Sequence, residues 1–170
     1  MALIMRVGRR RRWIWFVLPA AILMLPVAWY LGSPLFLNKT VNEALTASDA
    51  MPGAEPKALA RGIFVDVDAV HKGKGTATVY RVGDDVVLRL DPFEVTNGTD
   101  LYVYLSGHPA PRNSGQLHEG AAIEVGRLKG NIGAQNYTLP AGTDLSRYRS
   151  VVVYCRRFSV VFSTAELTTQ

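Results

Sequence analysis

The stretch VVVYCRRFSVVF, residues 151–162, contains two short apolar runs separated by two arginines, and it holds the single cysteine of the chain, Cys155. Val, Tyr and Phe are enriched in strands because they suit a pleated, half-buried surface. The stretch carries no sustained 3.6-residue period of the kind that predicts a helix. The sequence therefore predicts two consecutive strands here, Ser150–Cys155 and Phe158–Thr164.

The alternation of side chains in this stretch changes phase. Alternate residues of a strand share a face, so Val153 lies on the same face as Cys155. The apolar residues from Phe158 to Phe162 have the opposite parity. The core-facing side must therefore change between Cys155 and Arg157, which requires a bulge or a turn. We expect Cys155 to lie at an irregularity rather than in the middle of a strand.

The same pattern of short strands and turns extends over the region that begins at Gly62. Further strands are predicted at residues 62–68, 75–82, 86–94, 101–106, 123–128 and 136–139. Turn-forming residues at 83–85 and 97–100 supply reversals between them. About eight short strands in roughly 110 residues predict an all-β fold, and we expect a single antiparallel β-sandwich.

One loop of this region, Gly107–Ala121, stands out by its length. Unstructured loops beyond about 12–15 residues are often functional or mobile. This loop carries His108 and His118, two of the three histidines of the chain. We expect both to be solvated.

The N-terminal part has the features of a membrane anchor. Trp13 to Leu31 form an uncharged run, WIWFVLPAAILMLPVAWYL, close to the roughly 20 residues that a spanning helix needs. All five arginines of residues 1–31 precede this run. By the positive-inside rule, residues 1–12 form a basic cytoplasmic tail, 13–31 a single transmembrane helix in the lipid bilayer, and the rest is exported across the cell membrane.

A cleaved signal peptide is the alternative interpretation of this run. Signal peptides have an apolar region of about 7–15 residues followed by a small-x-small cleavage site. Here the run is longer and ends in Trp-Tyr-Leu-Gly-Ser. The pattern favours the uncleaved anchor.

Residues 32–60 are predicted to be an extracytoplasmic linker that leads to a domain at 61–168. Prolines and glycines interrupt this segment, and Ala, Thr and Ser fill most of the rest. A short helical turn fits the pattern around Thr40–Ala47, although it is too short to be stable alone.

The distribution of charge excludes one class of function. The net charge of +5 arises from the N-terminal arginines, because residues 32–170 contain 14 basic and 14 acidic residues. A neutral domain lacks the basic surface that nucleic-acid binding requires. We expect no nucleic-acid partner.

The chain also lacks the common catalytic motifs. It contains no CxxC, G-x-S-x-G, H-E-x-x-H, G-x-G-x-x-G or complete Walker loop, so it signals no hydrolase, nucleotide enzyme or dithiol redox site. No metal site is predicted. Cys155 and the three histidines remain as candidate site residues, and His71 lies in a glycine-rich turn, HKGKG.

A lone cysteine leaves several roles open. Cys155 can be a buried small hydrophobe, a redox thiol, a thiolate ligand of a metal or haem, or half of an intermolecular disulfide. Arg156 and Arg157 follow it directly. Adjacent positive charge favours a thiolate.

The exported region carries a resemblance to a known family. The matching segments, in order, are Gly62-Ile63-Phe64, His71, Gly75-Thr76-Ala77, LRLDPFEVTNGTDLYVYLS (88–106), GRLKGNIGAQNYTLP (126–140), DLSRYRSVVVYCRRFSVVF (144–162) and Ala165-Glu166-Leu167. Their order and spacing resemble the DM13 domain family, a small β module of animal and bacterial extracellular proteins. The chain is similar to a membrane-anchored bacterial member with one such domain.

The resemblance implies a fold and a function. It implies a β-sandwich related to the DOMON group of haem- or sugar-binding modules, and an electron-transfer role centred on the family cysteine, here Cys155. His71 matches the family's histidine and becomes its possible cofactor-binding partner. The cofactor and the redox partner stay unspecified.

Two rival functions remain. The domain can be a non-enzymatic surface module for binding or adhesion, with Cys155 structural and Gly107–Ala121 as the contact surface. Alternatively, Cys155 can join two copies covalently.

Overall fold

A computed structural model describes residues 17, 19, 22–26, 37–45 and 55–169 of the chain. It separates into two units, residues 1–37 and residues 38–170, and each is described by itself. In the first unit the described residues 17, 19 and 22–26 are helical. They are part of the predicted span 13–31, whose remaining residues, like the predicted tail 1–12, lie outside the described residues. Within the described parts of the chain, no helix combines the length and apolar character needed to cross a membrane.

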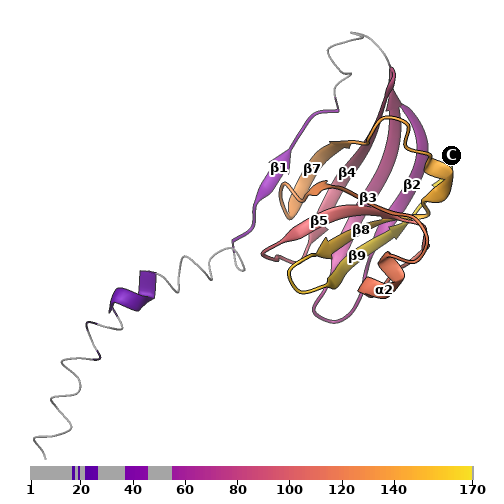
Figure 1. Cartoon of the computed structure of the whole chain (residues 1–170). Helices are drawn as coiled ribbons and strands as arrows, with labels where there is room; N and C mark the ends of the chain where they lie inside the picture. Colours follow the sequence, from indigo (N-terminus) through magenta and orange to yellow (C-terminus); the bar gives the residue numbers. More distant parts are fainter. Residues whose placement is uncertain (1–16, 18, 20–21, 27–36, 46–54, 170) are drawn as a thin grey trace, which may run out of the picture. The chain divides into compact units, whose positions relative to one another are not determined.

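The regular secondary structure described in the second unit is almost entirely strand, which confirms the all-β prediction (Figure 1). The strands are β1 (Thr40–Asn42), β2 (Lys57–Asp66), β3 (Gly73–Val82), β4 (Asp85–Val95), β5 (Leu101–Ser106), β6 (Ala122–Arg127), β7 (Ile132–Thr138), β8 (Ser150–Cys155), β9 (Val160–Glu166) and β10 (Thr168–Thr169). Two short helices interrupt them, α2 (Ser114–Leu117) and the 3-10 helix η1 (Leu145–Arg147).

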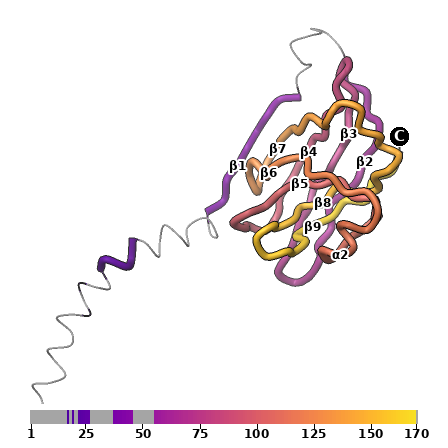
Figure 2. The backbone as a smooth tube through the Cα atoms, viewed as in Figure 1, coloured from indigo at the N-terminus to yellow at the C-terminus, as the bar shows by residue number. Residues whose placement is uncertain are grey.

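The strands form one continuous ten-stranded sheet in the order β1-β7-β4-β3-β2-β9-β8-β5-β6, with β10 beside β2. The sheet curls into a half-barrel, so that its two halves face each other across the core (Figures 1 and 2). The prediction of a sandwich of two antiparallel layers is therefore corrected to one curled sheet. Its strand pairs are antiparallel, except that β1 runs parallel to β7.

Strand β2 explains why the sheet is continuous. Its residues up to Ile63 pair with β3, and Phe64–Asp66 pair with β9. The change of partner occurs next to Gly62, where an added Cβ would collide with the backbone of Glu166. The lack of a side chain at Gly62 thus lets β2 bend closely past β9 and belong to both halves.

Strand β1 corrects the interpretation of Thr40–Ala47 as a helical turn. Thr40–Asn42 are extended and pair with Ile132–Ala134 of β7. Directly after the strand, the Glu43 carboxylate accepts hydrogen bonds from Lys129 Nζ at 2.8 Å and from the Asn136 backbone N–H at 2.8 Å. Pairing with β7, a strand far along the chain, therefore outweighs the helical preference of this segment, which is too short to form a stable helix alone.

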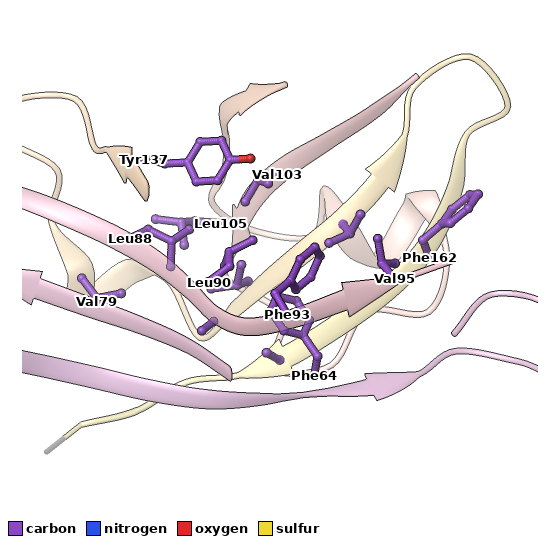
Figure 3. Packing of buried hydrophobic residues seen from close by; sticks show 14 of the residues in the cluster. Phe64, Val79, Leu88, Leu90, Phe93, Val95, Val103, Leu105, Tyr137 and Phe162 are labelled. Atoms are coloured by element: carbon purple, nitrogen blue, oxygen red, sulfur yellow. The ribbon is translucent and has the colours of Figure 1, made fainter. Parts of the chain in front are cut away.

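The core lies between the two halves of the curled sheet, and Figure 3 shows its packing. Leu88 and Leu90 of β4 and Val103 and Leu105 of β5 are fully buried within it. Phe93 of β4 packs edge-on against Phe64 of β2, with ring centroids 5.0 Å apart.

Strand β8 is buried on both faces. Its inward residues belong to the core, and its outward residues Val152 and Tyr154 belong to a second cluster with Leu117 of α2. The long loop Gly107–Ala121 is thus a structured cover over the outer face of β5 and β8. Leu117 is fully buried, and its carbonyl accepts a hydrogen bond from Ser106 Oγ at 2.9 Å.

Candidate functional site

Cys155 is the last residue of β8 and its side chain points into the core. It lies opposite Leu101 of β5 and Val160 of β9. The residue is 1% exposed, and it belongs to the same hydrophobic cluster as Val153. The thiol is free, and its surroundings are apolar.

The predicted irregularity lies directly after Cys155. Residues Arg156–Ser159 form a turn that ends in Ser159 with φ of 56° and brings Val160 opposite Cys155. The predicted phase change occurs across this turn, because Val153 and Cys155 before it and Phe162 after it belong to the same core cluster, against which Val160 also packs. A second shift of register follows at Phe162 of β9, because Tyr154 lies opposite Val161 whereas Val153 lies opposite Ser163. Phe158, which the parity pattern placed with the core residues, is 66% exposed in the turn.

Arg156, which directly follows Cys155, makes its contacts on the other side of the strand from the thiol. The Arg156 guanidinium stacks on the Tyr102 ring at 4.1 Å and its Nη1 donates to Glu124 Oε2 at 3.0 Å. Tyr102 and Glu124 belong to the outer face of the sheet, whereas Cys155 faces inward. Arg156 is therefore compensated by a carboxylate on the opposite side of the strand from the sulfur.

His71 is a hydrogen-bonded turn residue between β2 and β3. Its Nδ1 lies 2.7 Å from Asp68 Oδ2, and Asp68 Oδ1 accepts the backbone N–H groups of Val70 and His71 at 2.7 Å each. The ring packs edge-on against Phe162, with centroids 4.6 Å apart. Among the described residues no hydrogen bond joins His71 to Cys155. The two are linked only indirectly: Phe162, which packs against the His71 ring, belongs to the same core cluster as Cys155.

The pKa of Asp68 is lowered from its ordinary 3.8 to about 2, first by the hydrogen bond with His71 and then by the two backbone N–H groups. This group therefore supports the turn above about pH 4, and the support is lost as the pH falls toward 2. We expect the amide resonances of Val70 and His71 to shift together in that window in NMR spectra. In the Asp68→Asn variant this transition should be absent, whereas Asp84→Asn, in a different turn, should keep it.

The residues around Cys155 do not fit a metal or haem ligated by its sulfur. The sulfur is enclosed by apolar core side chains and His71 is engaged with Asp68. Within the described part of the chain, no three His, Cys, Asp or Glu side chains gather closely enough to hold a metal ion. The two loop histidines also lie elsewhere, with His108 Nδ1 accepting the Ala110 N–H at 3.2 Å.

A cluster of aromatic rings on the outer face of β5 and β8 escaped the sequence prediction. We call Tyr104, Tyr154 and His118 the outer-face cluster. Its ring centroids are 5.6 Å apart for Tyr104 and Tyr154, 6.4 Å for Tyr104 and His118, and 6.2 Å for His118 and Tyr154. The alternation in LYVYLS and VVVYC was the available signal, because it places each tyrosine on the face opposite the core.

Both phenols of the outer-face cluster have defined partners. The Tyr104 hydroxyl donates to Glu124 Oε2 at 2.7 Å, and the Tyr154 hydroxyl lies 2.9 Å from Ser114 Oγ of α2. Burial, followed by the bond to Glu124, raises the pKa of Tyr104, and the same bond lowers the pKa of Glu124. Tyr104 is therefore a neutral phenol held against an ionised carboxylate.

A separate polar cleft of about 450 Å³ lies at one end of β3 and β4. Its lining includes Asp66, Lys74, Glu94, Thr96 and Asn131. Neither Cys155 nor His71 lines it.

A protein-family model matches most of the second unit. The family model described as "Electron transfer DM13" matches residues 64–167, more than half of the chain and nearly all of the second unit. No curated protein and no solved structure matches the chain significantly.

Proposed function

The chain belongs to the DM13 electron-transfer family, and on that basis we propose that its β domain transfers single electrons through the thiol of Cys155. The observation that carries the proposal is the position of Cys155, the one thiol of a domain that matches this family over residues 64–167. The sulfur lies at the end of β8, one residue before an exposed turn.

The burial of Cys155 favours electron transfer over thiol chemistry at the sulfur itself. Thiol–disulfide exchange requires a thiolate to attack a sulfur atom that it can reach. At 1% exposure, Cys155 is closed to such an attack and to a disulfide with a second copy in this fold. Transfer of an electron over a short distance needs no direct contact, so a buried thiol can still exchange one with a partner at the surface.

We place this domain outside the cell, on a single-pass anchor at residues 13–31, with the N-terminus in the cytoplasm. The uncharged run and the arginines before it support this placement. The lipid bilayer is then one partner, and a redox protein or small electron carrier outside the cell is the other.

Protein-film voltammetry of the full-length chain in detergent tests the role of Cys155. We expect a reversible one-electron wave, in which the thiol gives an electron to the electrode and a proton to solvent near the turn, and regains both on the return sweep. Cys155→Ala should abolish the wave and lower the free energy of unfolding by only about 1 kcal/mol. An unchanged wave in Cys155→Ala, or a folded wild-type protein without a wave, contradicts the proposal.

A surface module for binding or adhesion remains the second candidate function. The burial of Cys155 in an apolar cluster favours it, because cysteine often acts as a small core residue. The polar cleft beside Lys74 and Glu94 offers such a module a binding surface. The loop Gly107–Ala121, the contact surface expected from the sequence, is partly occupied in covering β8. A folded protein without the voltammetric wave would favour this candidate.

A further inference from the structure

We propose that the outer-face cluster is a second redox-active site, in which Tyr104 loses one electron to an outer-sphere oxidant and passes its phenolic proton to Glu124. The proposal rests on the electron-transfer role proposed above. The outer-face cluster then provides a route for electrons between the buried end of β8 and the surface of the domain.

The hydrogen bond between Tyr104 and Glu124 is the first support. A phenol that loses an electron becomes strongly acidic, so its oxidation is easiest where a base already accepts the O–H. Glu124 Oε2 lies 2.7 Å from the Tyr104 hydroxyl, within the reach needed for proton transfer. The side chain of Tyr104 is held in place, because the residue is only 9% exposed.

The positive charge of Arg156 keeps Glu124 ionised, so its carboxylate carries no proton before the step. Arg156 donates to the same oxygen, Oε2, at 3.0 Å and is itself stacked on Tyr102 at 4.1 Å. The hydrogen bond from Tyr104, and after it the bond and charge of Arg156, lower the pKa of Glu124, so the carboxylate is ionised before the step. They also make Glu124 return the proton readily, which favours a reversible step.

Electrons and protons balance between Tyr104, Glu124 and the external oxidant. The oxidant, a one-electron outer-sphere metal complex, takes one electron from the Tyr104 ring. The O–H bond of Tyr104 breaks, and its proton bonds to Glu124 Oε2. The products are a neutral tyrosyl radical, a neutral carboxylic acid and the reduced metal complex.

The ring contacts provide the route. Tyr154 lies 5.6 Å from Tyr104 between ring centroids and directly precedes Cys155 in the chain. His118 contacts both rings and is exposed, so it is the member of the cluster that faces solvent. The Tyr154 hydroxyl meets Ser114, a neutral group that accepts a proton poorly, so the radical should settle on Tyr104.

Another buried phenol of the chain provides a matched comparison. The Tyr137 hydroxyl donates to the Gln135 amide oxygen at 2.8 Å, and Tyr137 is 6% exposed. An amide oxygen is no base for a phenolic proton. Tyr137 therefore shares the burial of Tyr104 but lacks its carboxylate partner.

Flash photolysis tests this site. The full-length chain in detergent is oxidised by a photogenerated ruthenium(III) polypyridyl complex, and tyrosyl radical is followed by its near-ultraviolet absorption and by electron paramagnetic resonance. The measurement is made in Cys155→Ala, so that it does not depend on the thiol. We expect Tyr104→Phe to remove most of the radical and Glu124→Gln to lower its rate of formation about tenfold or more, whereas Tyr137→Phe leaves both unchanged.

The outcomes separate this site from the role of Cys155. Radical formation that survives in folded Tyr104→Phe, or that falls equally in Tyr137→Phe, overturns the tyrosine site. If the radical forms on Tyr104 but the wild-type chain gives no Cys155 wave, the thiol function fails and the tyrosine site stands. If the wild-type chain gives the Cys155 wave but no radical forms on Tyr104, Cys155 is the redox group and the outer-face cluster is not redox-active.

Discussion

Replacing Gly75 by alanine should destabilise the second unit by more than about 3 kcal/mol. Gly75 has φ of +111°, a conformation that costs other residues about 1–3 kcal/mol. In addition, its added Cβ would collide with the backbone carbonyl of Pro92 and the Cα of Phe93 in the neighbouring strand. These are backbone atoms of a paired strand, so they cannot rotate away. Urea unfolding of the full-length chain, followed by circular dichroism, measures the loss.

Gly142→Ala is the matched control for this substitution. Gly142 also has positive φ, +77°, but no atom lies within 4 Å of the Cβ position. It should therefore lose only the conformational part, about 1–2 kcal/mol. Equal losses at the two positions would show that the collision with β4 does not contribute.

Phe162→Ala should be the second severe substitution, with a loss of about 3–5 kcal/mol in the free energy of unfolding. Phe162 occupies the bulge of β9, is 8% exposed and belongs to the core cluster (Figure 3). Its ring also packs against the ring of His71. Its removal leaves a cavity that the paired strands cannot close. Denaturant unfolding gives the free energy, and the His71 ring resonances report whether the turn at Asp68 loosens.

Phe158→Ala provides the comparison within the same stretch. Phe158 is 66% exposed in the turn, so its replacement should change the free energy of unfolding by about 0.5 kcal/mol or less. The sequence placed Phe158 and Phe162 on one face. If the two variants lose similar stability, the bulge and the turn at Arg156–Ser159 are misassigned.

The sequence predicted strands best where their ends are marked by local chemistry. Leu101–Ser106 and Ser150–Cys155 match the structure residue for residue, because a continuous run of apolar and aromatic residues ends there at turn residues. Strand β9 begins at Val160 rather than Phe158, since an apolar residue in an exposed turn resembles a strand residue. Strand β1 was missed because its pairing partner, β7, lies about ninety residues further along the chain.

In the candidate site too, features set by neighbouring residues could be predicted from the sequence, whereas features set by strand pairing could not. The irregularity beside Cys155 could be predicted from parity alone, and the structure confirms a turn there. The burial of the thiol, the direction of Arg156 and the separation of His71 from Cys155 depend on how β8 pairs with β5 and β9. The outer-face cluster needs that register and the fold of the loop that carries His118, so no single stretch of sequence contains it.

Strand β1 has a consequence for where the folded domain begins. The seven residues of β7 would otherwise present unpaired backbone groups along one side, which is a template for association with another chain. Three residues of β1 cover part of that edge. The Glu43 carboxylate, which follows them, accepts hydrogen bonds from Lys129 and Asn136 and holds β1 in place. A chain shortened to start at residue 61, the boundary predicted from sequence, or at 64, where the family match begins, loses this cover and part of β2. We therefore expect residues 40–43, which belong to the predicted linker, to protect the domain from aggregation.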